Sequence, residues 1–72
     1  MYILQHFDNE SGEWYFIDRY STWYQLKMGM VKYAFNLYST ELQRFRVSEK
    51  DKIIKVYHVD IQVNVKEFNL VE

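Results

Sequence analysis

The strictest alternation of apolar and polar residues lies near the carboxyl end of the sequence. Five apolar residues alternate there with five polar ones: Tyr57, Val59, Ile61, Val63 and Val65 against His58, Asp60, Gln62, Asn64 and Lys66. This period of two predicts a long strand over 57–66 with one buried and one solvated face. Ile61 would face the core and Gln62 the solvent. Phe68 and Leu70 fall on the polar parity, so a bulge or turn is expected before the chain ends.

Two further strands are predicted near the amino terminus. Residues 2–7 and 13–20 are rich in β-formers, and the polar segment between them ends in Gly12, which is typical of a hairpin turn. Trp14 and Phe16 alternate with Tyr15 and Ile17, so both faces of the second strand carry large apolar groups. A sheet covered on one side only would leave several of them in contact with water.

A long helix is predicted after the hairpin. Thr22 and Gln25 have the spacing of a capping box, which indicates a helix start. One stripe with alternating steps of four and three then runs to the charged segment: Tyr24, Met28, Val31, Phe35, Tyr38, Leu42 and Phe45. We expect much of this stripe to pack on the chain's own strands. Residues 31–37 also alternate as a strand would, but that pattern accounts for fewer positions. Gly29 weakens a helix by about 1 kcal/mol relative to alanine and suggests close packing.

These elements predict an α+β fold of ββαβ order, a three-stranded antiparallel sheet with one long helix, in a single domain over 1–72. The chain has 72 residues and no cysteine, yet 49% of its residues are hydrophobic and 19% aromatic. A second helical row of Trp23, Leu26, Met30, Ala34 and Leu37 widens the apolar arc further. So much apolar surface is difficult to bury in one small copy, so a homodimer is expected. The expected interface residues are Trp14, Phe16, Trp23 and Phe35.

The candidate chemistry is sparse. His58 and Asp60 share one face of the last predicted strand, but a solvated face explains them better than catalysis, and no serine lies in a nucleophile elbow. His6 and His58 lack the close spacing of metal ligands. Gly12 and Gly29 are too far apart for a phosphate loop. We therefore expect no catalytic site, no metal and no cofactor.

One basic cluster stands out in an otherwise balanced chain of formal net charge −1. The segment 44–55 sets Arg44, Arg46, Lys50, Lys52 and Lys55 against Glu49 and Asp51. With Phe45 and Tyr57 nearby, it could contact phosphates and stack a base of a nucleic acid. The alternative is an ordinary solvated helix end and turn.

The order of hairpin, long helix and long last strand, with the hairpin reading YILQHFDNESGEWYFIDRY, resembles the Yopt family of small uncharacterised Bacillus-prophage proteins. The resemblance implies a homodimer whose monomers have one helix and three strands, in a phage or prophage setting. It implies no functional residue.

The leading functional hypothesis is a homodimeric, non-enzymatic interaction protein of phage type that binds an unidentified host or phage macromolecule. The alternative is a nucleic-acid-binding accessory protein that uses the basic segment 44–55. The amino terminus lacks the features of a signal peptide, and no apolar run is long enough to span a membrane. We therefore expect a cytoplasmic location in a bacterial host and no membrane partner.

Overall fold

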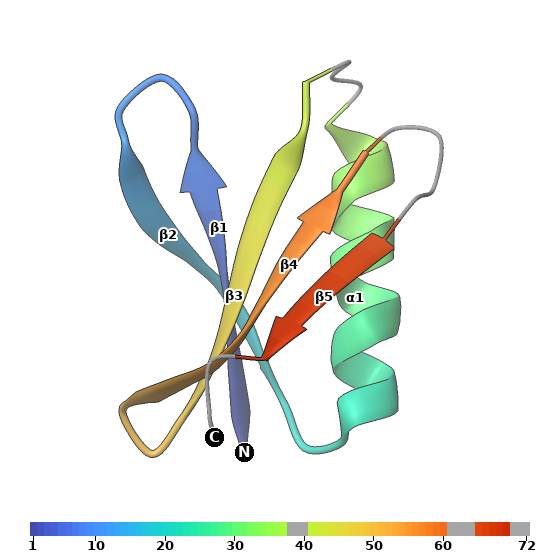
Figure 1. Ribbon diagram of the computed structural model, residues 1–72. Helices are drawn as coiled ribbons and strands as arrows, with labels where there is room; N and C mark the ends of the chain where they lie inside the picture. The colour runs from blue at the N-terminus through green and yellow to red at the C-terminus, as the bar shows by residue number, and fades with distance from the viewer. Residues whose placement is uncertain (38–40, 61–64, 70–72) are drawn as a thin grey trace.

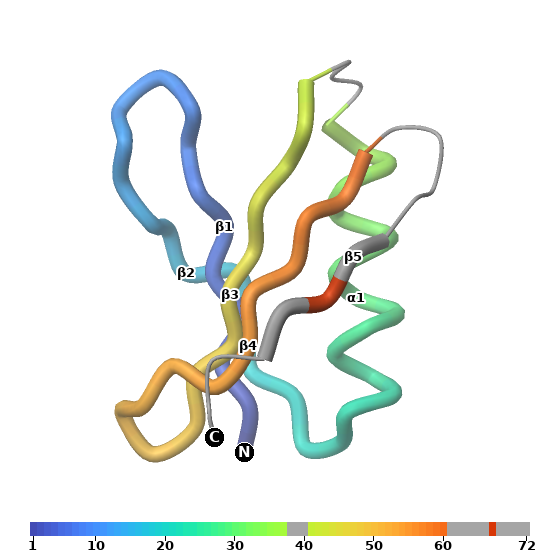
Figure 2. The backbone as a smooth tube through the Cα atoms, in the orientation of Figure 1, coloured from blue at the N-terminus to red at the C-terminus, as the bar shows by residue number. Residues whose placement is uncertain are grey.

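A computed structural model describes residues 1–37, 41–60 and 65–69, and within the last range the side chain of Glu67 alone. Figures 1 and 2 show one helix beside a twisted sheet. The elements are β1 (Tyr2–Asp8), β2 (Glu13–Tyr20), α1 (Trp23–Asn36), β3 (Gln43–Glu49), β4 (Lys52–Val59) and β5 (Val65–Asn69).

All five strands belong to one antiparallel sheet with the order β2-β1-β3-β4-β5. The chain forms the β1–β2 hairpin, crosses one face of the sheet as α1, and returns to add β3 beside β1 (Figure 1). The strands β4 and β5 then extend the sheet away from β1. In the ranges that the structure describes, no helix has the length and apolar character needed to span a membrane.

The predicted three-stranded ββαβ fold is wrong, because the observed order is ββαβββ. The helix ends at Asn36, and the segment expected to form its last turns is β3. Leu42 and Phe45 fit the helical spacing, but Gln43, Phe45 and Val47 are also buried at a period of two. Lys50 and Asp51, both with positive φ (52° and 63°), join β3 to β4 in a two-residue turn suited to a tight hairpin.

The single long strand predicted over 57–66 is also wrong. The structure has two antiparallel strands there, β4 ending at Val59 and β5 beginning at Val65, and these two residues pair with each other. Positions 61–64, including Ile61 and Gln62, lie outside the described residues. The strands predicted at 2–7 and 13–20 are confirmed as β1 and β2.

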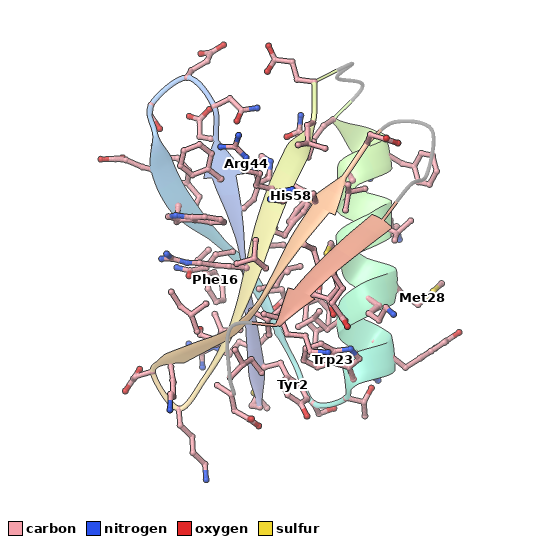
Figure 3. The ribbon with its side chains drawn as sticks, in the orientation of Figure 1. Tyr2, Phe16, Trp23, Met28, Arg44 and His58 are labelled. Atoms are coloured by element: carbon pink, nitrogen blue, oxygen red, sulfur yellow. The ribbon has the colours of Figure 1, made fainter. Side chains whose placement is uncertain are left out.

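The core lies between α1 and one face of the sheet. It comprises Leu4, Leu26, Met30, Phe45, Val47, Tyr57 and Val59, each no more than 3% exposed. The helix contributes Leu26 and Met30 from the second of the two predicted apolar rows. The expectation that the first row would pack on the sheet is wrong, because Tyr24 and Met28 are 73% and 56% exposed. Figure 3 shows Met28 on the side of α1 away from the sheet.

The predicted helix start is confirmed. Thr22 is the N-cap, with extended backbone, and its side chain accepts a hydrogen bond of 3.2 Å from the backbone N–H of Gln25. The suggested close packing at Gly29 is also confirmed, because Gly29 lies against the Tyr20 ring. The one-helix, three-strand monomer implied by the Yopt resemblance differs from this arrangement. The structure comprises a single chain, so the dimer stays a prediction.

Candidate nucleic-acid interface

The sheet has a second face, directed away from α1, that no described element covers; we call it the open face. Side chains alternate along a strand, so the neighbours of the buried core residues point to this side. The pairing of strands forms a row across it, in which Phe16 is paired with Gln5, Gln5 with Arg46, and Arg46 with Val56. The open face carries Ile3, Gln5 and Phe7 of β1, Trp14, Phe16 and Arg19 of β2, Arg44, Arg46 and Ser48 of β3, and Val56 and His58 of β4.

Each arginine of the open face lies near an aromatic ring. The guanidinium carbon of Arg46 is 4.5 Å from the centroid of the Trp14 ring, and that of Arg44 is 5.5 Å from the Phe7 ring. Arg46 also donates a hydrogen bond from Nε to Oε1 of Gln5 at 2.7 Å. The rings of Phe7 and Trp14 are themselves packed edge to face, with centroids 5.1 Å apart. The aromatic rings and Gln5 therefore hold two cations in place on β3.

The electrostatic character of the open face is positive. None of the strand residues of β1 to β4 on this face is acidic. Asp18 is paired with buried Leu4, and Asp8 and its partner Glu13 have the parity of Leu4. Glu49, paired with Lys52, has the parity of buried Val47. Asp60 comes directly after β4. Lys55 and Glu67 form an ion pair of 3.0 Å, and neither of them lies on the open face. The guanidinium groups therefore keep their charge available to an anionic ligand.

The predicted basic segment 44–55 is divided by the sheet. Arg44 and Arg46 lie on the open face, whereas Lys50 and Lys52 lie at the exposed β3–β4 turn. Lys55 lies on the helix side, where its Nζ is 4.7 Å from the centroid of the Trp23 ring and 3.0 Å from Oε1 of Glu67. The five cations thus do not form one patch, and the two arginines instead join the aromatic residues of the hairpin.

A buried tyrosine anchors the helix side of β4. The hydroxyl of Tyr57 donates a hydrogen bond of 2.6 Å to Oε2 of Glu67. This bond and the neighbouring ammonium of Lys55 hold the pKa of Glu67 below its usual value. Burial, followed by the hydrogen bond to Glu67, raises the pKa of the Tyr57 phenol. These contacts connect β5 to β4 and leave Lys55 and Glu67 to neutralise each other.

The four predicted dimer-interface residues lie on different surfaces. Trp14 and Phe16 are on the open face, and Phe16 is 56% exposed. Trp23 lies between α1 and the sheet, with its ring 4.9 Å from that of Tyr2 and 6.2 Å from that of Tyr57. Phe35 is an exposed residue of α1. Figure 3 shows Phe16 over the sheet and Trp23 at the foot of α1.

The two histidines are in separate environments. His58 is on the open face, paired with Arg44, whereas the His6 ring packs 4.9 Å from Phe45 and its Nε2 lies 2.7 Å from Oε1 of Gln43. His6 also borders a polar hollow near the α1–β3 connection, lined by His6, Asp8, Asn9, Glu10, Leu37, Glu41 and Gln43. No group of three or more metal-binding side chains occurs within the described ranges. The carboxylates of the hollow would repel phosphate, in contrast to the open face.

Sequence reasoning included Arg44 and Arg46 among the candidate nucleic-acid contacts but missed Gln5, Phe7 and Arg19. The missed signal was the alternation of residues 43–49, which places both arginines on one face of a strand. The pairing of β1 with β3, which brings Phe7 and Gln5 beside them, has no local signal in the sequence. Comparison with protein-family models, with curated proteins and with solved structures gives no match, so the Yopt resemblance and the phage setting stay predictions.

Proposed function

We propose that this protein is a non-enzymatic nucleic-acid-binding protein and that the open face is its binding surface. The observation that carries the proposal is the set of three guanidinium groups beside aromatic rings, on a sheet face without a strand carboxylate. Arginine is a strong donor to phosphate, and aromatic rings on a sheet can stack bases. Such a protein would act in the cytoplasm of a bacterial host.

Charge distinguishes nucleic acid from a protein partner as the occupant. Arginine and aromatic residues are also enriched at protein interfaces, but there an opposing acidic surface would be needed to neutralise the arginines. A nucleic acid supplies a negative charge with every phosphate, whatever its sequence. The acidic residues of the described strands have the parity of the buried core residues, so they do not oppose a polyanion on the open face.

Fluorescence anisotropy with labelled oligonucleotides at 50 and 200 mM salt tests the proposal. Three phosphate contacts predict a slope of log K against log salt of about −2 for a single strand, which corresponds to roughly twenty-fold weaker binding at the higher salt. The double variant Arg44→Gln, Arg46→Gln should reduce the slope to about −0.7, because one contact remains.

The matched control is the double variant Lys50→Gln, Lys52→Gln, which removes the same charge from the β3–β4 turn. It should retain most of the affinity and most of the salt dependence. Circular dichroism verifies that both variants stay folded. Absence of binding to any oligonucleotide, or an equal loss in the two double variants, would refute the proposal and favour a protein ligand or unspecific attraction.

We also propose that the protein associates as a homodimer, and the observation that favours this is the outer stripe of α1. Tyr24, Met28, Val31 and Phe35 are spaced by four, three and four residues, as in a helix–helix seam, and Phe35 is 49% exposed. Sedimentation equilibrium should show dissociation in Met28→Glu and no change in the control Phe16→Glu on the open face. A monomeric wild type at high micromolar concentration would exclude the homodimer.

A further inference from the structure

We infer that the nucleic acid bound by the open face is single-stranded, with an unpaired base stacked on Phe16. This inference rests on the proposed function and names its ligand class. Three observations support it: the exposure of Phe16, the occupation of the neighbouring rings by arginines, and the row of residues that connects Phe16 to Arg46.

Phe16 is the ring of this face that a base can reach. Its exposed fraction is 56%, whereas Phe7 and Trp14 are partly buried. Arg46 covers Trp14 at 4.5 Å, and Arg44 lies over Phe7, so these two rings already serve as supports for guanidinium groups. Arg19 lies farther from its ring, at 5.8 Å from the centroid of Phe16. Among the described side chains of this face, two rings are thus covered by close cations, and Phe16 is the ring left exposed to a ligand.

The strand order places Phe16 and the arginines of β3 where one single strand could contact both. Phe16 on β2 and Arg46 on β3 are both cross-strand partners of Gln5, which lies between them on β1. Two interstrand spacings separate the backbones of β2 and β3 by about 10 Å. A base over Phe16 would thus lie over the edge of the sheet, while the sugar-phosphate backbone follows the arginines of β3. Arg19, beside Phe16, is positioned for a further phosphate contact.

A duplex cannot use both parts of this surface. Its phosphates can reach the arginines, but its bases are stacked and paired, and a base must leave the stack before it can contact a protein ring. A single strand already exposes its bases and stacks them on aromatic side chains. Phe16 should therefore contribute to single-strand binding alone, whereas Arg44 and Arg46 should contribute to both.

The experiment compares labelled oligothymidylate, labelled oligouridylate and a duplex, each of about 15 nucleotides or base pairs, at low salt. Phe16→Ser should weaken binding of single strands by about five- to a hundred-fold and leave duplex binding within about two-fold, since stacking one base has an effect of that size. The matched control is Tyr15→Ser, which removes an exposed aromatic ring from the same strand but from the side opposite to the open face. Phe16→Trp should restore single-strand binding, because it restores a ring.

The outcomes separate this inference from the proposed function. Salt-dependent binding with equal affinity for duplex and single strand, or with no effect of Phe16→Ser, would overturn the single-strand inference and leave the proposed function intact. Loss of single-strand binding in Tyr15→Ser equal to that in Phe16→Ser would also overturn it. Failure of every probe to bind would overturn both. Tighter binding of either single strand than of the duplex supports the inference, and the preferred strand identifies the sugar.

Discussion

Replacement of Gly29 by alanine should destabilise this protein, although alanine is the better helix former. Gly29 lies within α1, and its Cα faces the Tyr20 side chain at the end of β2. A Cβ at this position would be 2.6 Å from Cζ and 2.9 Å from Cε1 of Tyr20, and closer still to the hydroxyl. Carbon atoms pack at about 3.5 to 4.0 Å, so the ring or the helix must move by about 1 Å.

Two opposing effects determine how much Gly29→Ala changes the free energy of unfolding. Alanine favours the helix by about 1 kcal/mol over glycine. An extra methyl group in a packed site costs about 1 to 3 kcal/mol. The Tyr20 side chain is only partly buried but packs against the core, so its ring can move away from the added methyl group only to a limited extent. We expect Gly29→Ala to lower the free energy of unfolding by about 1 kcal/mol, within a range of about 0 to 2.

A double-mutant cycle in urea isolates the contact. A Tyr20→Ala background removes the three atoms nearest to the added methyl group, so Gly29→Ala should raise the free energy of unfolding there by about 1 kcal/mol relative to that background. The sign of the Gly29 effect thus reverses between the two backgrounds. An equal effect of Gly29→Ala in both would show that Tyr20 does not restrict this site and would refute the close packing of α1 on β2.

Three further outcomes are expected from equilibrium unfolding. Thr22→Ala should cost about 1 kcal/mol because it removes the N-cap acceptor, and Thr22→Ser should restore most of it. Phe45→Ala should cost about 3 to 5 kcal/mol because Phe45 is fully buried, whereas Phe16→Ala should cost far less because Phe16 is exposed. Equal losses would contradict the placement of the core. The pKa of Glu67 is lower in the folded protein than its usual value of 4.5, so the ionised carboxylate stabilises the fold at neutral pH. This stabilisation is lost as the pH falls below 4.5 and through the pKa of Glu67 in the folded state. The stability difference between wild type and Glu67→Gln should therefore be largest near neutral pH and should shrink as the pH falls below 4.5. A difference independent of pH would contradict the contact with Tyr57.

Local patterns in the sequence were sufficient for the hairpin and for the start of the helix. Alternating β-formers around a polar turn produce β1 and β2, and Thr22 caps α1 as its spacing to Gln25 predicted. These features depend on contacts between residues near each other in the chain, so they can be inferred without tertiary structure. The sequence also predicted that large apolar side chains of β2 would lie on the face not covered by the helix, because alternation along the strand places Trp14 and Phe16 on one face.

Tertiary contacts decided the end of the helix and the orientation of its apolar rows. Leu42 and Phe45 continue a helical spacing by coincidence, but pairing of β3 with both β1 and β4 satisfies the backbone of 43–49 as a strand. The two apolar rows of the helix form an arc too wide for one sheet face to cover, and the sequence does not indicate which row packs on the sheet. Packing placed Leu26 and Met30 inside and left Tyr24 and Met28 exposed.

The candidate site shows the same division between sequence and tertiary structure. The cationic character of Arg44 and Arg46 is evident in the sequence, as is the aromatic character of the first hairpin. Their proximity is not, because Arg46 reaches Gln5 across a separation of 41 residues. Residues this far apart come into contact only because β3 pairs with β1. The local strand propensity of a segment does not indicate which strands will be its neighbours in the sheet. The sequence therefore determined which residues could bind a nucleic acid, and the antiparallel pairing of β1 with β3 determined that they share one surface.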